Sequence, residues 1–281
     1  MGVIQREGVN LIMPVVKFND TEIYFEERGK GEPLILIMGL GAEGSLWEEH
    51  VKIYEKYFRC ILIDNRGAGC SGKPVGPYTT SMMADDTIGV MNALKIQNAH
   101  ISGISMGGAI AQEIALKYPE RVKSMTLIST WPKCDAYLTR VFEMLKSLIQ
   151  ISDPVTLGRM LQLWTFTAEY HTSHMDDLLR REEQSISSFH PMPVHAFMAQ
   201  CDACINHDTI ERLDKIKIPV LITVGDEDIF TPIRFSQSIV KKIINSELFV
   251  VKGGGHTHHW EKLNEFNQKS LSFLQKCQQP E

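Results

Sequence analysis

The feature that most constrains the fold is a set of short, almost continuously apolar runs that alternate with helix-like stretches. The runs are PLILIMG (33–39), RCILID (59–64), AHISGIS (99–105), VKSMTLIST (122–130), IPVLITVGD (218–226) and ELFVV (247–251). An uninterrupted apolar run of this length predicts a strand buried on both faces. Strands that alternate with helices predict crossover units and a mainly parallel sheet with helices on both faces, which is an α/β fold.

The N-terminal part of the chain has a different pattern. VVKF and TEIYFEER flank the turn pair Asn19-Asp20, which predicts an antiparallel hairpin. Met13-Pro14 would serve as an alternative start, so residues 1–12 are expected to be a floppy extension. These residues lack the apolar stretch and cleavage site of a signal peptide.

The segment 133–208 interrupts the strand–helix alternation. It contains no convincing strand and is rich in helix formers and large apolar residues. An all-helical insertion between two core strands predicts a cap over the carboxyl edge of the sheet, where open α/β sheets bind ligands. Residues 1–132 and 209–281 would then form the core and 133–208 the cap. About two thirds of the cap's large apolar residues are expected to pack its own small core, and the rest to line a pocket.

Composition excludes several classes of partner. The chain has 281 residues, 43% of them hydrophobic, and a net charge of −5. An acidic balance gives no reason to expect nucleic acid or an anionic membrane surface as a partner. No apolar run approaches the roughly 20 residues that a membrane-spanning helix needs. The composition leaves the oligomeric state open, a homodimer included.

The cysteines favour a reducing compartment. Without an export signal, six scattered cysteines are expected to be free thiols, and the protein is expected to be cytoplasmic. The one CxxC, Cys201 to Cys204, has no second pair to complete a zinc site, so its spacing indicates packing on a helix.

A G-x-S-x-G pentapeptide stands where a predicted strand meets a predicted helix. In that context Gly103, Ser105 and Gly107 form a sharp turn that projects the serine off the top of the sheet. Met106 begins the helix, so its main-chain N–H is free and points at the space beside Ser105. A serine in this position is a candidate nucleophile, and it needs a base and an acid that orients the base.

Two later strand ends offer these groups. VLITVGDEDIFTP places Asp226 and Asp228 after one strand, and LFVVKGGGHTHHW places His256 after the next. The order Ser, Asp, His along the chain is typical of a nucleophile turn of this kind. The spacing leaves both aspartates open as the acid.

With these pieces the chain resembles an α/β-hydrolase of the small esterase/lactonase type, a group that includes enzymes similar to 3-oxoadipate enol-lactonase. The resemblance covers residues 14–277. It rests on LILIMGLG, DNRGAGCS, GISMGG, GDEDIFTP and GGGH…WEKLNEFN. It implies an α/β-hydrolase fold in which Ser105 is the nucleophile and His256 the general base. The family pattern G-x-x-D…P matches Gly225, Asp228 and Pro232, so Asp228 is implied as the orienting acid and Asp226 as a turn cap.

The resemblance also implies an oxyanion hole. The main-chain N–H groups of Leu40 and Met106 would form it. Many relatives have His-Gly where this chain has Met38-Gly39, but a backbone donor does not depend on the side chain at that position. Epoxide hydrolysis and dehalogenation are disfavoured, because both require a carboxylate where Ser105 stands.

The cluster GGGHTHHW raises the question of a metal site. Three histidines in four residues lack the HExxH or comparable ligand set that would complete a metal shell. The triad interpretation of His256 is therefore preferred, with no metal and no cofactor. His258 and His259 are expected to open the final helix or to border the pocket.

The favoured function is hydrolysis of carboxylic esters through an acyl-enzyme, on small to medium, partly hydrophobic substrates. An enol-lactonase or a C–C bond hydrolase of aromatic catabolism would use the same residues, and so remains an alternative. A hydrolase-fold sensor that binds a ligand with little turnover could also keep an intact triad. The partner expected in each case is a small molecule, an ester or a lactone for the enzyme.

Overall fold

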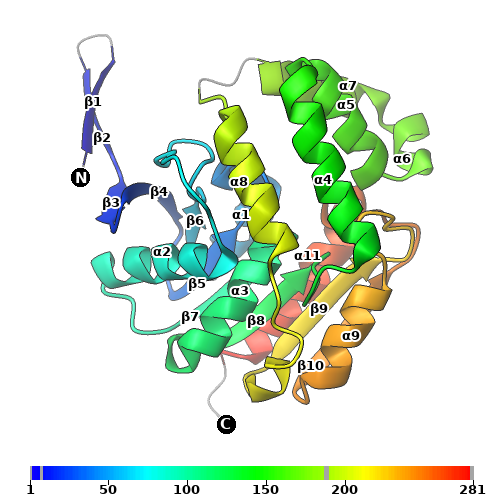
Figure 1. Cartoon of the computed structure of the whole chain (residues 1–281). Coiled ribbons are helices and arrows are strands. Elements are labelled where there is room, and N and C mark those ends of the chain that lie inside the picture. The colour runs from blue at the N-terminus through cyan, green and yellow to red at the C-terminus, as the bar shows by residue number, and fades with distance from the viewer. Residues whose placement is uncertain (1, 7–8, 187–189, 279–281) are drawn as a thin grey trace.

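The protein is described by a computed structural model that covers residues 2–6, 9–186 and 190–278. Its centre is an eight-stranded sheet with the order β10-β9-β8-β7-β5-β6-β4-β3 (Figure 1). The strands are β3 (Val15–Phe18), β4 (Thr21–Arg28), β5 (Glu32–Ile37), β6 (Phe58–Ile63), β7 (Ala99–Ile104), β8 (Val122–Ile128), β9 (Val220–Gly225) and β10 (Ser246–Val251).

The six strands from β10 to β6 are parallel, and β4 and β3 add an antiparallel edge. Every residue of β7 and β9 is buried. The predicted α/β class and N-terminal hairpin are confirmed. The uninterrupted apolar runs are the central strands because both of their faces are covered.

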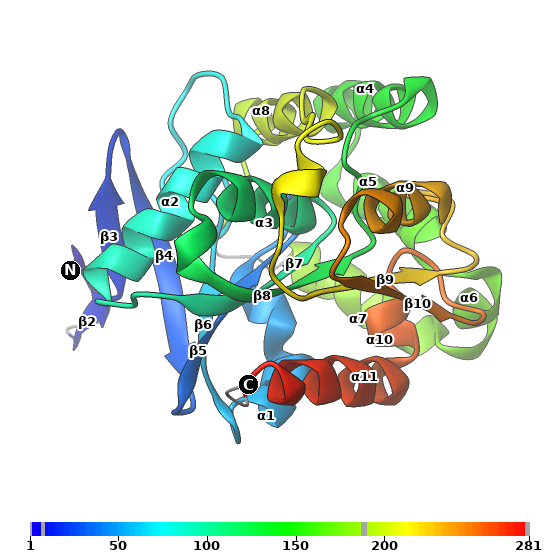
Figure 2. The ribbon, with the colours of Figure 1, turned by 90° about the horizontal axis from the view of Figure 1, so that it is seen from below.

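Helices cover the two faces of the sheet (Figure 2). One face carries α2 (Thr80–Ala93), α3 (Met106–Lys117) and α9 (Arg234–Lys242), and the other carries α1 (Glu48–Tyr54) and α11 (Leu263–Lys276). Each layer buries its own apolar cluster against the strands. Because alternate residues of a strand point to opposite faces, Ile35 and Ile37 belong to one cluster and Leu34 and Leu36 to the other.

An insertion of helices lies between β8 and β9. It consists of α4 (Ala136–Ile151), α5 (Pro154–Thr165), α6 (Ala168–Ser173), α7 (Met175–Ile186) and α8 (Val194–Ile205). Figure 1 shows these helices above the sheet. An antiparallel bridge and an ion pair join Lys133 to Asp208 at the base of the insertion. The insertion lies over the carboxyl ends of the strands, because its hydrogen bonds to the core run to the loops that follow β5, β6 and β10.

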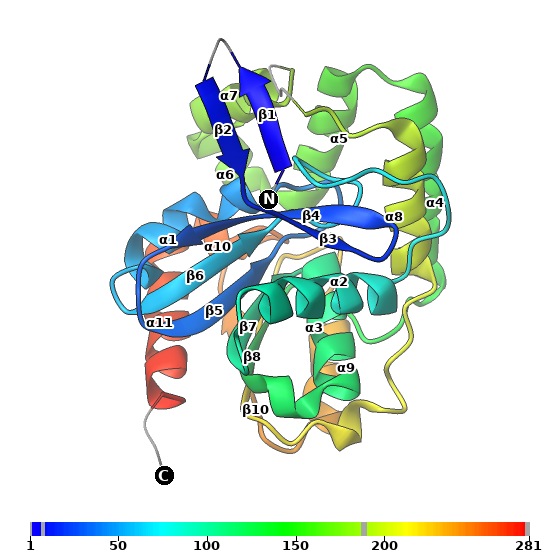
Figure 3. The same cartoon turned by 90° about the vertical axis from the view of Figure 1, so that its left-hand side faces the viewer.

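The N-terminal extension, which the sequence predicts to be floppy, contains a hairpin of its own. β1 (Gly2–Arg6) and β2 (Val9–Met13) pair in antiparallel register, from Gly2 with Met13 to Arg6 with Val9. The hairpin stands apart from the main sheet in Figures 1 and 3. In this register the two segments satisfy each other's N–H and C=O groups.

Within the described ranges, no helix is both long and apolar enough to cross a bilayer.

Candidate active site

Ser105 stands at the turn between β7 and α3. Its backbone is strained, with φ 55° and ψ −116°, a region that non-glycine residues rarely adopt and that is common at active sites. A Cβ at Gly103 would lie 2.2 Å from the Gly107 carbonyl oxygen, and one at Gly107 would lie 2.2 Å from the Ile37 carbonyl oxygen. Only glycine fits at either position, which explains the G-x-S-x-G spacing.

The next strand fixes the backbone of Ser105. The Ser105 N–H donates to the Ile128 carbonyl at 2.8 Å, and the Thr130 hydroxyl donates to the Ser105 carbonyl at 2.8 Å. Both partners lie at the end of β8 or just after it. The two peptide units that flank the Ser105 Cα are therefore both hydrogen-bonded to the end of β8. Ser105 itself is 7% exposed.

Asp228 and His256 form a buried pair at the ends of β9 and β10. His256 Nδ1 lies 3.0 Å from Asp228 Oδ2. An ionised carboxylate can only accept, so Nδ1 carries the proton and Nε2 keeps its lone pair. Asp228 also accepts hydrogen bonds from the Phe230 and Thr231 N–H groups and from the Thr231 hydroxyl, at 2.7 to 2.8 Å. The carboxylate is thus saturated with donors.

This environment sets the charge on Asp228. Burial raises its pKa, but attraction to His256 and the hydrogen bonds from His256 and Thr231 outweigh burial, so the pKa lies below its ordinary value. The carboxylate therefore stays ionised at neutral pH. An ionised Asp228 stabilises a positive charge on His256, which a general base acquires when it accepts a proton.

The loop that carries His256 crosses closely over the end of β9. A Cβ at Gly225 would lie 2.0 Å from the Gly254 carbonyl oxygen, and the Glu227 N–H donates to that same carbonyl at 3.0 Å. Asp226 faces the other way: its carboxylate accepts from the Gly253 N–H and pairs with Lys252. Asp228, and not Asp226, is the aspartate that contacts His256.

The end of β8 also links His256 to the serine turn. The Ser129 hydroxyl donates to the His256 carbonyl at 2.8 Å, while the adjacent Ile128 and Thr130 hold Ser105. Residues 128–130 therefore carry Ser105 on one side and the His256 backbone on the other. Among the described residues no hydrogen bond joins the Ser105 hydroxyl to His256, and such contacts are often long before a substrate binds.

The two predicted oxyanion donors are placed next to the serine. Met106 is the first residue of α3, so its N–H has no carbonyl partner within the helix. A Cβ at Gly39 would lie 3.2 Å from Ser105 Cβ, which puts the Gly39–Leu40 peptide in contact with the serine. The Leu40 N–H has no hydrogen-bond partner in the described part of the chain.

Sequence reasoning missed two hydroxyls. Thr231 lies 3.0 Å from His256 Nδ1 and donates to Asp228, and Ser129 holds the His256 carbonyl. A threonine three residues after an aspartate is a known turn pattern in which the carboxylate accepts local N–H groups, so Thr231 could have been found. Nothing local to Ser129 indicates its partner 127 residues away.

One expectation was that His258 and His259 border the pocket, and the burial of both side chains shows that they do not. They begin the short helix α10 (His258–Glu261), separate from α11, and both side chains are fully buried. His258 lies between Ser129 and Thr223, and His259 contacts His50. Burial lowers the pKa of His258 to about 3, so it stays neutral. Among the described residues no three His, Cys, Asp or Glu side chains are grouped to hold a metal ion.

Aromatic rings line one side of the pair. Phe230 lies 4.8 Å from the His256 ring, centre to centre, and contacts both Phe142 of α4 and Trp164 of α5. Phe142 is fully buried against Trp131. The insertion therefore supplies apolar rings that reach His256 through Phe230. Among its described residues, Leu138, Leu145 and Phe197 are buried in the main core cluster.

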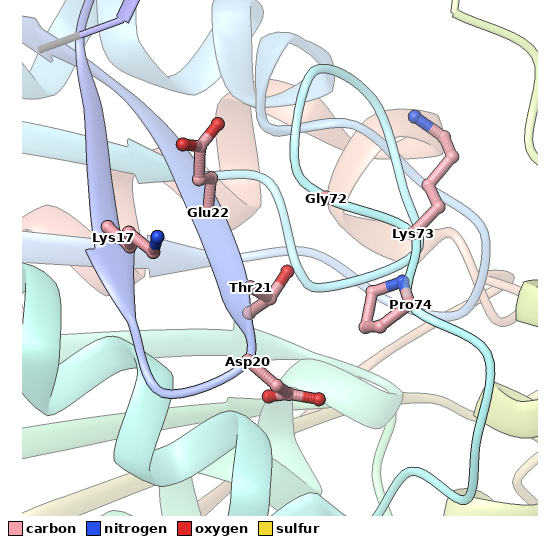
Figure 4. Close-up of a pocket in the computed structure, with 7 residues that line it drawn as sticks. All are labelled: Lys17, Asp20, Thr21, Glu22, Gly72, Lys73 and Pro74. Atoms are coloured by element: carbon pink, nitrogen blue, oxygen red, sulfur yellow. The ribbon is translucent and has the colours of Figure 1, made fainter.

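A surface pocket of about 310 Å³ lies elsewhere, between the β3–β4 hairpin and the loop at Gly72–Pro74. Figure 4 shows Lys17, Asp20, Glu22 and Lys73 around it. Its lining includes charges of both signs and none of the predicted catalytic residues. It is separate from the candidate active site.

Comparison with known proteins agrees with this fold. A family model described as alpha/beta hydrolase fold matches residues 32–263. The chain is 28% identical over 261 residues to a protein of Azorhizobium caulinodans named "Putative carbamate hydrolase RutD", covering 93% of this chain and 98% of that one.

Solved structures give the same architecture. An enol-lactonase from Burkholderia xenovorans superposes with a TM-score of 0.86 at 24% identity, over 93% of this chain and 100% of the other. A thermophilic esterase from Thermogutta terrifontis superposes with a TM-score of 0.84 at 22% identity, over 95% and 99%. At these identities the likeness shows the fold alone. The chain belongs to the α/β-hydrolase fold family, as its sequence motifs predicted.

Proposed function

We propose that the protein is a serine hydrolase that cleaves carboxylic esters through an acyl-enzyme. The observation that carries the proposal is the buried Asp228–His256 pair, whose imidazole is held with Nδ1 protonated. Residues 128–130 bind both the His256 backbone and the serine in the strained nucleophile turn. A structural role would not require these three residues at the ends of three different strands.

The proposed mechanism follows from these contacts. The Ser105 hydroxyl attacks the ester carbonyl while His256 Nε2 takes its proton, and Asp228 stabilises the resulting cation. The Leu40 and Met106 N–H groups hold the negative charge on the carbonyl oxygen. Protonated His256 then gives its proton to the departing alcohol. Water, activated by the neutral imidazole, attacks the acyl-enzyme and releases the acid.

The surroundings support substrates with an apolar part. Phe230 stands next to His256, and rings from α4 and α5 continue the surface away from it. Small or medium esters with a hydrophobic acyl or alcohol group fit this environment best. Lactones place the same carbonyl in a ring, so an enol-lactone remains an alternative, as in the Burkholderia xenovorans neighbour.

Carbamates are a second candidate, and the RutD relatives favour them. The likeness to the Azorhizobium caulinodans protein extends over nearly the whole of both chains. A carbamate carbonyl can be attacked by the same serine and held by the same two donors. Ester and carbamate hydrolysis would share the serine nucleophile and would differ in the group that leaves the carbonyl carbon.

The test is hydrolysis of p-nitrophenyl acetate, butyrate and octanoate by the wild-type protein and by Ser105→Ala. The proposal predicts turnover faster than about 1 per second, lost by at least 10³-fold in Ser105→Ala, as expected when a triad member is removed. An aryl carbamate and an enol-lactone measured in parallel rank the alternatives. Activity that survives in Ser105→Ala would refute the assignment, and tight binding of all these compounds without turnover would favour a sensor.

A further inference from the structure

Gln200 of the insertion makes two hydrogen bonds to the core beside the candidate active site. It lies on α8 and is fully buried. Its Oε1 accepts from the Gly41 N–H at 2.8 Å, and its Nε2 donates to the Arg66 carbonyl at 2.8 Å. A main-chain N–H can only donate and a carbonyl can only accept, so these partners fix the orientation of the amide.

Gly41 belongs to the turn that carries the predicted oxyanion donor. The Ala42 N–H donates to the Gly39 carbonyl at 3.3 Å, which closes a four-residue turn over 39–42. Gly41 has φ +69°, as the third residue of a type II turn requires. The Leu40 N–H shares its peptide plane with the Gly39 carbonyl and points the opposite way. The direction of the Leu40 N–H is therefore set by the way the turn is held.

The Gln200 amide holds this turn from outside it. Its other end rests on a rigid support, because the Arg66 guanidinium is buried and bound by both oxygens of Asp86, at 2.6 and 2.8 Å. The neighbouring Phe197 ring contacts the same turn: a Cβ on Gly41 would lie 3.3 Å from it. Helix α8 thus contacts the turn by one hydrogen bond and one ring.

We propose that Gln200 is a positioning residue that aligns the Leu40 N–H with the oxyanion. Its side-chain hydrogen bonds go to Gly41 and Arg66 and not to Ser105, so it acts through the 39–42 turn. This inference rests on the proposed function and deepens it, since it assigns part of the oxyanion hole to the insertion. It predicts that losing the amide slows the chemical step and leaves substrate binding unchanged.

The probe is diethyl p-nitrophenyl phosphate. Ser105 Oγ forms a bond to phosphorus, the bond from phosphorus to the aryl oxygen breaks, the hydroxyl proton goes to His256, and one equivalent of p-nitrophenolate leaves. The phosphoryl oxygen takes the place of the oxyanion. The limiting rate at saturation reports the bond-forming step, and the half-saturation concentration reports binding.

Gln200→Leu removes both hydrogen bonds at similar volume. The control is Asn267→Leu, which removes a buried amide on α11 whose hydrogen bond goes to His50 and not to the 39–42 turn. The expected result is a limiting rate at least 10-fold lower in Gln200→Leu, with a half-saturation concentration within 2-fold of wild type. The control stays within 2-fold in both. Should Gln200→Leu not fold, Gln200→Met replaces it.

Gln200→Leu reacting at the wild-type rate would overturn the inference. So would an unchanged limiting rate with weaker binding, which would make Gln200 a residue of the binding pocket. A wild-type protein that releases no p-nitrophenolate, or a Ser105→Ala variant that reacts as the wild type does, would contradict the proposed function itself. The two failures are therefore distinguishable.

Discussion

At the scale of the residue, two aspartates two positions apart have different environments. Asp228 is buried and accepts hydrogen bonds from His256, Thr231 and a main-chain N–H, whereas Asp226 is exposed and pairs with Lys252. The two side chains leave the turn after β9 toward different partners: Asp228 contacts His256, whereas Asp226 accepts from the Gly253 N–H. This turn gives a matched pair of variants.

Asp228→Asn is expected to lower kcat/KM for a p-nitrophenyl ester by about 10³-fold or more. An amide cannot stabilise the imidazolium, and its NH₂ group facing Nδ1 would favour the wrong tautomer. Asp226→Asn, with the same chemical change in an exposed position, is expected to stay within about 2-fold. Steady-state kinetics at pH 7 measure both. Equal losses in the two variants would contradict the assignment of Asp228.

At the scale of the element, the turn between β7 and α3 depends on close packing of backbone on backbone. Gly107 and Gly89 both stand inside helices and both lack room for a Cβ. The obstacle at Gly107 is the main chain of β5, at 2.2 Å from the Ile37 oxygen, whereas at Gly89 it is the ring of Phe18, at 2.5 Å. A ring on an edge strand can move aside, but a central strand cannot.

Gly107→Ala is therefore expected to lower the free energy of unfolding by about 3 kcal/mol or more, through overpacking. Gly89→Ala is expected to cost less, about 1 to 2 kcal/mol, because the Phe18 ring has to shift from its base and the gain in helix propensity offsets part of that cost. Urea unfolding followed by circular dichroism gives both values. A Gly107→Ala variant as stable as Gly89→Ala would show that α3 can move away from the sheet.

Local sequence patterns predicted part of this site, and contacts between distant segments could not be predicted from them. Local patterns predicted the strand, turn and helix around Ser105, and the order of Asp228 and His256 after later strands, because periodicity and turn chemistry act over a few residues. They could not predict that Gln200 binds Gly41, or that His259 contacts His50, since these partners lie 159 and 209 positions apart. Such contacts depend on how elements pack.

At the scale of the whole molecule, buried neutral histidines dominate the response to acid. Burial lowers the pKa of His50 to about 4, those of His207 and His258 to about 3, and that of His259 well below its ordinary value. In the unfolded chain each would titrate near 6.5. Asp64 acts in the opposite sense, since burial raises its pKa to about 6.

The protein is expected to lose stability as pH falls from 6.5 toward 4. In this window the unfolded chain binds protons on these histidines and the native chain does not, so the free energy of unfolding falls by about 1.4 kcal/mol per pH unit for each one. Asp64 takes up its proton in the native state first, between pH 6 and 4, and offsets about one histidine. The urea midpoint should therefore drop steadily below pH 6.5.

His207→Gln is expected to flatten this slope, because it removes one buried group that resists protonation. His195→Gln, a change at an exposed position, should leave the slope as it is. Urea midpoints measured from pH 7 to pH 4.5 give the comparison. A midpoint that stays constant between pH 7 and 5 in the wild-type protein would contradict the neutral, buried state of these histidines.

Covalent labelling tests most directly whether Ser105 is the nucleophile. The protein is treated with a fluorophosphonate, and its intact mass and peptides are then measured, for wild type and for Ser105→Ala. We expect one adduct per chain, on the peptide that contains Ser105, and none in Ser105→Ala. An adduct on another residue, or equal labelling of Ser105→Ala, would contradict this role for Ser105.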